Sequence, residues 1–158
     1  MKSLDHIIIK KAEKSDFPLV AELRHRLWPQ DTVAEHQSEL QELSEIAPLC
    51  DFIAYDTTSD GGYDTDTAVA FAEASIRPYA NGCLYRPVAF LEGIWCAYDY
   101  QNLGIGAALI AEVEKWGKAQ GAKELGSDAY LENETAHSAH EKWGFEMTEK
   151  VVYFRKKL

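Results

Sequence analysis

Apolar residues along this chain change their spacing several times, and each change marks the boundary of a predicted element. Short apolar or alternating runs predict six strands, at residues 4–11, 50–56, 67–76, 87–97, 123–129 and 145–157. Apolar residues three or four apart predict four helices, at residues 16–28, 32–46, 104–120 and 133–143. Pro18 suits the first turn of a helix, Gly121 and Gly144 suit helix ends, and the turn-rich stretch 57–66 predicts a hairpin. We therefore expect a single α+β domain, residues 1–158, built on a sheet of mixed strand direction.

One turn between a predicted strand and a predicted helix is rich in glycine. It reads Gln101-Asn102-Leu103-Gly104-Ile105-Gly106. Glycines at such a turn let backbone N–H groups point outward at the positive end of the helix dipole, so an anion can approach without meeting a Cβ atom. Leu109 stands where a dinucleotide fingerprint needs Gly or Ala, and no Gly-Lys-Ser/Thr follows as in a P-loop. The turn predicts a pyrophosphate site, and a glycine turn without a ligand is the alternative.

The charge of the chain bears on its partners. Its 158 residues include 26 Asp and Glu against 16 Lys and Arg, a net charge of −10. Such a balance disfavours binding to nucleic acid phosphates and would attract a cationic ligand, although solubility alone would also account for it.

The cysteines and the apolar segments bear on location. Three cysteines without metal-ligand spacing suggest neither a disulfide framework nor a metal site. No segment is long and apolar enough for a signal peptide or a membrane span. We expect a cytoplasmic protein that uses no metal and does not associate with membranes.

The glycine turn resembles a known loop. Its Gln/Arg-x-x-Gly-x-Gly/Ala pattern is similar to the acetyl-CoA loop of the GCN5-related N-acetyltransferases, the GNAT superfamily. A second motif of that family is similar to the helix that here opens at Asn133 and closes at Gly144-Phe145. The resemblance implies acetyl-CoA as cosubstrate and the GNAT fold, a mostly antiparallel, twisted sheet of six to seven strands with four helices. Residues 97–101 depart from the family pattern, because many relatives have Pro and Arg there. Without that arginine, the pyrophosphate has one possible cation partner fewer.

Further motifs, spread over nearly the whole chain, resemble the aminoglycoside 6′-N-acetyltransferases. They are Leu27-Trp28-Pro29, Ala74-Ser75-Ile76-Arg77, Tyr79-Ala80-Asn81-Gly82-Cys83, Phe90-Leu91-Glu92-Gly93-Ile94, Ser127-Asp128, Glu132-Asn133 and Val152-Tyr153-Phe154-Arg155-Lys156. This resemblance implies transfer of an acetyl group to the 6′-amino group of aminoglycoside antibiotics by direct nucleophilic attack, and hence antibiotic resistance.

Two carboxylates are candidate catalytic residues. Glu92 lies in the apolar run 88–95, where an ionised carboxylate is costly, so it either meets a partner or faces a cleft. Asp128 ends a predicted strand, where it could equally cap a helix or a turn. Either carboxylate, directly or through water, could hold a substrate ammonium and accept its proton. We favour Glu92 as the base or water-orienting group.

The resemblance assigns further contacts to the aminoglycoside. Trp28 would line the sugar site, although a tryptophan at a helix end is by itself more typical of a core. Tyr79 and Glu149 would also contact the substrate, together with Glu92 and Asp128. In relatives the tyrosine can reach the neighbouring subunit's cleft, which implies a homodimer.

The acetyl-CoA contacts follow from the same resemblance. Backbone N–H groups of Ile94, Trp95 and Cys96 would meet the thioester and the pantetheine arm if a bulge splays that strand. Residues 101–106 and Ala107 would bind the pyrophosphate, and Asn133 the arm. His140 stands where many acetyltransferases have a tyrosine that protonates the departing thiolate, although a half-buried structural histidine is the more economical interpretation.

Two other functions remain open from the sequence. A related acetyltransferase could bind acetyl-CoA with the same part of the chain and act on another amine, such as a polyamine or a protein amine. A CoA-binding sensor without turnover is the third possibility, and the joint presence of Trp28, Glu92 and Asp128 disfavours it.

Overall fold

The computed structural model describes residues 2–58 and 61–158. The strands are β1 (Ile7–Lys11), β2 (Leu49–Asp56), β3 (Ala68–Arg77), β4 (Val88–Cys96) and β5 (Leu125–Ser127). The helices are α1 (Phe17–Leu27), α2 (Val33–Ile46), α3 (Ile105–Ala119) and α4 (Glu134–Lys142). All four predicted helices and the first five predicted strands are confirmed, with ends shifted by a few residues.

The strands form one five-stranded sheet in the order β1-β2-β3-β4-β5. The first three pairings are antiparallel, and β4 and β5 run parallel. The α+β class and the mostly antiparallel sheet are therefore confirmed, while the expected count of six to seven strands was too high. The hairpin predicted between the second and third strands is confirmed as β2–β3, and residues 59 and 60 of its connection lie outside the described residues.

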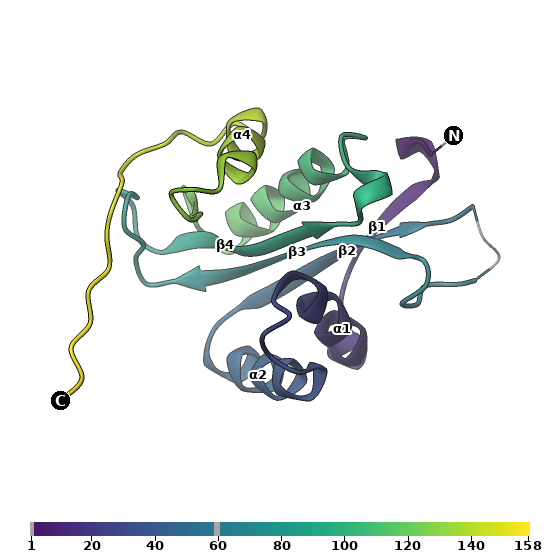
Figure 1. Ribbon diagram of the computed structural model, residues 1–158, viewed down its shortest axis with the longest axis horizontal. Coiled ribbons are helices and arrows are strands. Elements are labelled where there is room, and N and C mark those ends of the chain that lie inside the picture. Colours follow the sequence, from purple (N-terminus) through teal and green to yellow (C-terminus); the bar gives the residue numbers. More distant parts are fainter. Residues whose placement is uncertain (1, 59–60) are drawn as a thin grey trace. The chain divides into compact units, whose positions relative to one another are not determined.

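Helices cover both faces of the sheet (Figure 1). One face packs against α1 and α2, and its core joins Val20, Leu23 and Leu40 of those helices to Ile53 and Phe71 of the sheet. The other face packs against α3, whose buried residues are Ile105, Leu109, Ile110, Val113, Trp116 and Gly117. Helix α3 contacts β2, β3 and β4 on this face. Side chains of β3 and β4 that face α1 and α2 thus lie between two layers, where a site can form.

Helix ends follow the sequence signals. Pro18 lies in the first turn of α1, and Thr32 and Glu35 form a reciprocal capping box at the start of α2. Gly121 and Gly144 follow α3 and α4 with φ of 86° and 88°, as expected for glycines that end helices. None of the helices in the described residues is long and apolar enough to cross a membrane.

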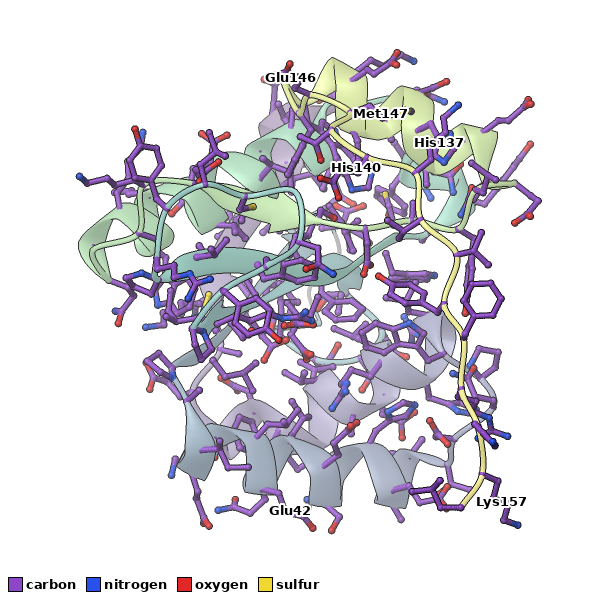
Figure 2. The ribbon with its side chains drawn as sticks, turned by 90° about the vertical axis from the view of Figure 1, so that its left-hand side faces the viewer. Glu42, His137, His140, Glu146, Met147 and Lys157 are labelled. Carbon is purple, nitrogen blue, oxygen red and sulfur yellow. The ribbon has the colours of Figure 1, made fainter. Side chains whose placement is uncertain are left out.

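The chain divides into two compact units, Met1–Ser127 and Asp128–Leu158. The second unit contains α4 and a terminal segment, 145–158, without helix or strand. Figure 2 shows His137 and His140 on α4, Glu146 and Met147 just after it, and Lys157 near the end of the extended segment. The predicted strand 145–157 was therefore wrong. Val151, Val152, Tyr153 and Phe154 have strand propensity but are exposed, because propensity supplies no partner strand to complete a ladder.

Candidate functional site

Glu92 lies at an irregularity in the ladder between β3 and β4. Ala74 pairs with Leu91 and Glu73 pairs with Gly93, so Glu92 is an extra residue in β4 that has no cross-strand partner. Such a bulge redirects a side chain and is common beside active sites. It turns Glu92 toward the side chains that β3 presents to α1 and α2.

The Glu92 carboxylate is paired there. Its Oε1 accepts hydrogen bonds from Ser75 Oγ at 2.5 Å and Arg77 Nε at 2.9 Å, and its Oε2 accepts one from Arg77 Nη2 at 2.6 Å. The side chain of Glu92 is about three-quarters buried and that of Arg77 is partly exposed. Of the two outcomes expected for a carboxylate in this apolar run, a partner is therefore present, and Glu92 also lines a cavity.

Trp28 packs against the residue that follows Glu92. A Cβ atom built on Gly93 would lie 2.6 Å from both Cη2 and Cζ2 of Trp28 and 2.7 Å from Cδ2 of Leu27. Only glycine leaves room for the indole at this position. Trp28, at the end of α1, and Glu92, in β4, therefore meet at the same bulge.

A cavity of about 580 Å³ opens at this point between the two helices and the sheet. Its lining includes Trp28 and Glu92, together with Arg77 and Ser75. Four carboxylates line it, Asp31, Glu39, Glu73 and Glu92, against the two guanidinium groups of Arg24 and Arg77. The volume falls in the range of small-molecule sites, and the excess of carboxylates favours a cationic ligand.

One of the lining carboxyl groups, Glu73, belongs to a buried carboxyl pair. Asp51 of β2 pairs with Glu73 of β3, and both are almost completely buried, Glu73 with 1% of its surface exposed. Arg24 of α1 lies beside them, with its Nε 3.5 Å from Glu73 Oε2, and its Nη2 donates to Glu39 at 2.7 Å. Burial and the neighbouring Glu73 raise the pKa of Asp51 well above its usual range. Burial also raises the pKa of Glu73, and Arg24 opposes the rise at both groups. The raised pKa of Asp51, and the position of Arg24 beside Glu73, indicate that the pair shares one proton, carried mainly by Asp51.

His36 fixes the backbone of Trp28. Its Nε2 lies 2.9 Å from the Trp28 carbonyl oxygen, and because a carbonyl only accepts, this nitrogen carries the hydrogen. Trp28 N–H in turn donates to the Arg24 carbonyl at 2.7 Å. With His36 only 2% exposed, the end of α1 is held from both sides.

The predicted anion site has the required backbone conformation. Gly104 is the N-cap of α3 with φ of 89°, and Asn102 has φ of 61°. No side chain within the described residues caps the first turn of α3, so its N–H groups have no capping acceptor there. Gln101 donates to the Cys96 carbonyl at 3.3 Å, which directs its amide away from the turn. These residues fit a pyrophosphate bound by backbone N–H groups.

The strand before that turn loses one neighbour. Pairing between β4 and β5 covers only Ala89, Phe90 and Leu91 and ends just before the bulge. Beyond it, Ile94, Trp95 and Cys96 pair with β3 alone among the strands of the described residues. Backbone N–H groups alternate in direction along a strand. At least one of the N–H groups of Ile94, Trp95 and Cys96 therefore points to the side away from β3.

A family comparison accounts for this combination of bulge, cavity and glycine turn. The model of the acetyltransferase (GNAT) family matches residues 20–145. The chain belongs to the GNAT acetyltransferase family. Among its GNAT relatives, an aminoglycoside N(6′)-acetyltransferase type 1 from Acinetobacter genomosp. 13 is 44% identical over 135 residues, covering 85% of this chain and 87% of the relative. Another from Klebsiella aerogenes is 38% identical over 154 residues, covering 96% and 97%.

Solved structures agree with the family. AAC(6′)-Iy in complex with the bisubstrate analogue CoA-S-monomethyl-acetylneamine has a TM-score of 0.84 and 36% identity, with 97% of this chain and 99% of that chain covered. AAC(6′)-Ih from Acinetobacter baumannii has a TM-score of 0.82 and 38% identity, with coverage of 96% and 99%. The resemblance drawn from the sequence motifs is therefore confirmed.

The other predicted residues of this GNAT protein lie in different places. Tyr79 follows β3 in a loop, is 60% exposed, stacks loosely with Arg86 and is not part of the cavity lining described above. Asp128, Asn133, His140 and Glu149 belong to the second unit. The structure thus brings together Trp28 and Glu92, and groups residues 101–107 separately at the start of α3.

Within the second unit, the local contacts of these residues are clear. Asp128 immediately follows β5 and Glu149 lies in the terminal segment, and both are exposed. Asn133 caps α4 by accepting from the Ala136 N–H at 3.0 Å. His140 Nδ1 lies 2.7 Å from the Ala136 carbonyl, and its ring packs near Trp143 and Phe145. These contacts suit the structural interpretation of His140.

Several cavity residues were missed from the sequence. Arg24, His36, Asp51 and Glu73 all line or support the site, and none was predicted. For Asp51 and Glu73 a signal existed, since each interrupts an apolar strand as Glu92 does. Arg24 and His36 lie on amphipathic helices, where a polar residue at one position gives no such signal.

Proposed function

We propose that this GNAT enzyme transfers an acetyl group from acetyl-CoA to the 6′-amino group of aminoglycoside antibiotics. The observation that carries the proposal is the acidic cavity at the β4 bulge, where Trp28 and Glu92 meet. Its excess of carboxylates suits a polycationic sugar, and Trp28 offers an apolar face to a sugar ring. The names of relatives at 38–44% identity agree with this substrate.

Removing a proton from the amine is part of the reaction. A primary ammonium group has a pKa of roughly 10, so about one molecule in a thousand is uncharged at neutral pH, a cost of about 4 kcal/mol. We assign Glu92 to hold the ammonium through one hydrogen bond, and a neighbouring water carries the ammonium proton to solvent. The neutral nitrogen then attacks the thioester carbonyl carbon, and the C–S bond breaks. The acylated nitrogen loses a proton to give the amide, and the departing thiolate takes up a proton as CoA leaves.

The cosubstrate is acetyl-CoA, which supplies the acetyl thioester. We assign its pyrophosphate to the backbone N–H groups of residues 101–107, whose conformation fits an anion. The N–H groups of Ile94, Trp95 and Cys96 would stabilise the charge that develops on the thioester oxygen. This assignment uses the stretch of β4 that has no β5 partner.

Further assignments of the proposal concern residues outside the cavity. Asp128, Tyr79 and Glu149 would bind other groups of the substrate, with Asp128 as a second candidate catalytic carboxylate, and Asn133 and His140 would contact the acetyl-CoA arm. We also propose a homodimer that acts in the cytoplasm and confers antibiotic resistance. The exposed apolar run Val151–Phe154 supports self-association, because contiguous exposed apolar residues mark interaction surfaces.

A matched pair of substrates tests the proposal. Neomycin carries a 6′-amine and paromomycin carries a hydroxyl at that position, so only neomycin should release CoA thiol when each is incubated with the enzyme and acetyl-CoA. Mass spectrometry should locate one acetyl group on the 6′-nitrogen. Equal turnover of both compounds would contradict the regiochemistry, and turnover of spermidine or a peptide amine alone would indicate a different acceptor.

Resistance and assembly have separate tests. Expression in a susceptible bacterium should raise the inhibitory concentration of kanamycin, and the Glu92→Gln variant should not. Sedimentation of the full chain should give the mass of a dimer, and Phe154→Asp should shift it toward the monomer. A wild-type enzyme that sediments as a monomer would contradict the assembly without affecting the assigned activity.

A further inference from the structure

The Glu92 carboxylate enters the cavity with most of its hydrogen-bonding capacity already used by β3. Oε1 accepts from Ser75 and Arg77, and Oε2 accepts from Arg77. A carboxylate offers about four lone-pair sites, so these three bonds leave about one, on Oε2. The atom that can receive one more hydrogen is therefore set by two residues of the neighbouring strand.

The bulge makes this arrangement possible. Because Ala74 pairs with Leu91, an uninterrupted ladder would place Glu92 directly opposite Glu73. Two carboxylates in that relation repel each other. The extra residue instead puts Gly93 opposite Glu73 and leaves Glu92 to Ser75 and Arg77.

The guanidinium group of Arg77 is itself held in place. Its central carbon lies 3.6 Å from the ring centroid of Phe90, a buried residue of β4. A planar guanidinium can stack on a ring and present two parallel N–H groups to a carboxylate, and a lysine ammonium cannot do both. Arg77 therefore fixes the direction of Glu92 as well as balancing its charge.

We propose that Arg77 and Ser75 are positioning residues for the acceptor substrate. They hold Glu92 so that Oε2 directs its remaining lone pair toward the substrate ammonium beside Trp28. Neither residue touches the reacting atoms in this scheme, and both act through Glu92. The inference rests on the proposed function and narrows the substrate contact to one oxygen.

A double-mutant cycle tests whether Arg77 acts through Glu92. Arg77→Gln should raise the KM for neomycin by about tenfold or more, as expected for loss of hydrogen bonds to a charged group, and leave the KM for acetyl-CoA unchanged. In the Glu92→Gln background the same change should add no further loss. Arg77→Lys, which keeps the charge without the fork, should retain most of the KM defect, and Ser75→Ala should show a smaller one. Lys115→Gln removes an equal charge from the exposed side of α3 and should behave as wild type.

The outcomes distinguish this inference from the proposed function. If wild type acetylates neomycin but the losses from Arg77→Gln and Glu92→Gln simply add, Arg77 does not act through Glu92. Wild-type behaviour of Arg77→Lys would show that charge alone suffices and would likewise overturn the positioning role. Failure of the wild-type enzyme to acetylate any 6′-amine overturns the proposed function itself, and the inference with it. If melting curves show that Arg77→Gln is unfolded, Arg77→Lys and Ser75→Ala carry the test.

Discussion

The indole of Trp28 lies against the backbone of Gly93 so closely that no side chain fits between them. A Cβ at position 93 would come within 2.6 Å of two ring atoms, well inside ordinary contact distance. The contact couples the end of α1 to the β4 bulge. The cavity beside the bulge is therefore shaped by a residue that has no side chain.

Replacing that glycine should displace the tryptophan. Gly93→Ala should lower the free energy of unfolding by about 1–3 kcal/mol, the usual cost of overpacking, and raise the KM for neomycin more than that for acetyl-CoA. Steady-state kinetics and denaturant melts measure both effects. Adding Trp28→Phe, which removes the clashing outer ring, should restore part of the stability. A stable, fully active Gly93→Ala variant would contradict the role of the contact.

The proton shared by Asp51 and Glu73 should make stability depend on pH. Because the folded-state pKa of Asp51 is raised, the folded protein keeps a proton that the unfolded chain releases above about pH 4. Stability from this group is thus present at low pH and is lost as pH rises from that value toward the folded pKa.

Asp51→Asn should remove that loss, since an amide can donate to Glu73 without titrating. The free energy of unfolding of the variant, relative to wild type, should increase as pH rises from about 4 toward the folded pKa of Asp51, by at most about 1.4 kcal/mol per pH unit. Chemical denaturation at several pH values measures it. A difference that does not change with pH would show that Asp51 is ionised in the folded protein.

Arg24 is the nearest cation to the buried carboxylate of Glu73, so its removal should be costly. Arg24→Met should destabilise the protein by about 3–5 kcal/mol, because it leaves a buried charge without compensation. Glu73→Gln in the same chain should recover much of this loss. Thermal melts of the two single variants and the double variant provide the comparison, and equal destabilisation with and without Glu73 would argue against the pairing.

The two glycines at the ends of α3 allow a matched test of the acetyl-CoA turn. Gly104 and Gly121 have φ of 89° and 86°, and a Cβ at either would meet no atom closer than 3.8 Å. Alanine at either position should therefore cost about 1–2 kcal/mol of stability through backbone strain. Only Gly104→Ala should also raise the KM for acetyl-CoA. The increase should be roughly tenfold if the strain energy is lost from acetyl-CoA binding. Equal KM values for the two variants would place the pyrophosphate elsewhere.

How far the sequence predicts this structure depends on the kind of interaction. Helices and central strands follow from apolar periodicity and from capping residues such as Pro18 and Gly121, because burial on one face imposes a fixed spacing. The motif resemblance led correctly to the acetyltransferase family. Segment 145–157 was assigned to a strand on the same local criteria, yet no local pattern specifies the partner that a strand requires.

The site was predicted less completely, because it depends on strand register. That Glu92 would meet a partner could be inferred from its apolar surroundings, but the identity of that partner, Arg77, depends on one extra residue in the ladder. The pairing of Asp51 with Glu73 depends on register in the same way. Register is a property of two strands together, and a single stretch of sequence does not contain it.

The bulge also bears on how this enzyme could change its substrate. Glu92 has no cross-strand partner in the ladder with β3. A different side chain at position 92 therefore replaces neither the pair of Leu91 with Ala74 nor the pair of Gly93 with Glu73. Residues 93–96 pair with residues 70–73 of β3, and position 92 takes no part in that pairing. If Glu92 contacts the acceptor as we propose, acceptor preference can therefore diverge at this position while the pairing of the strand that we assign to acetyl-CoA stays as it is.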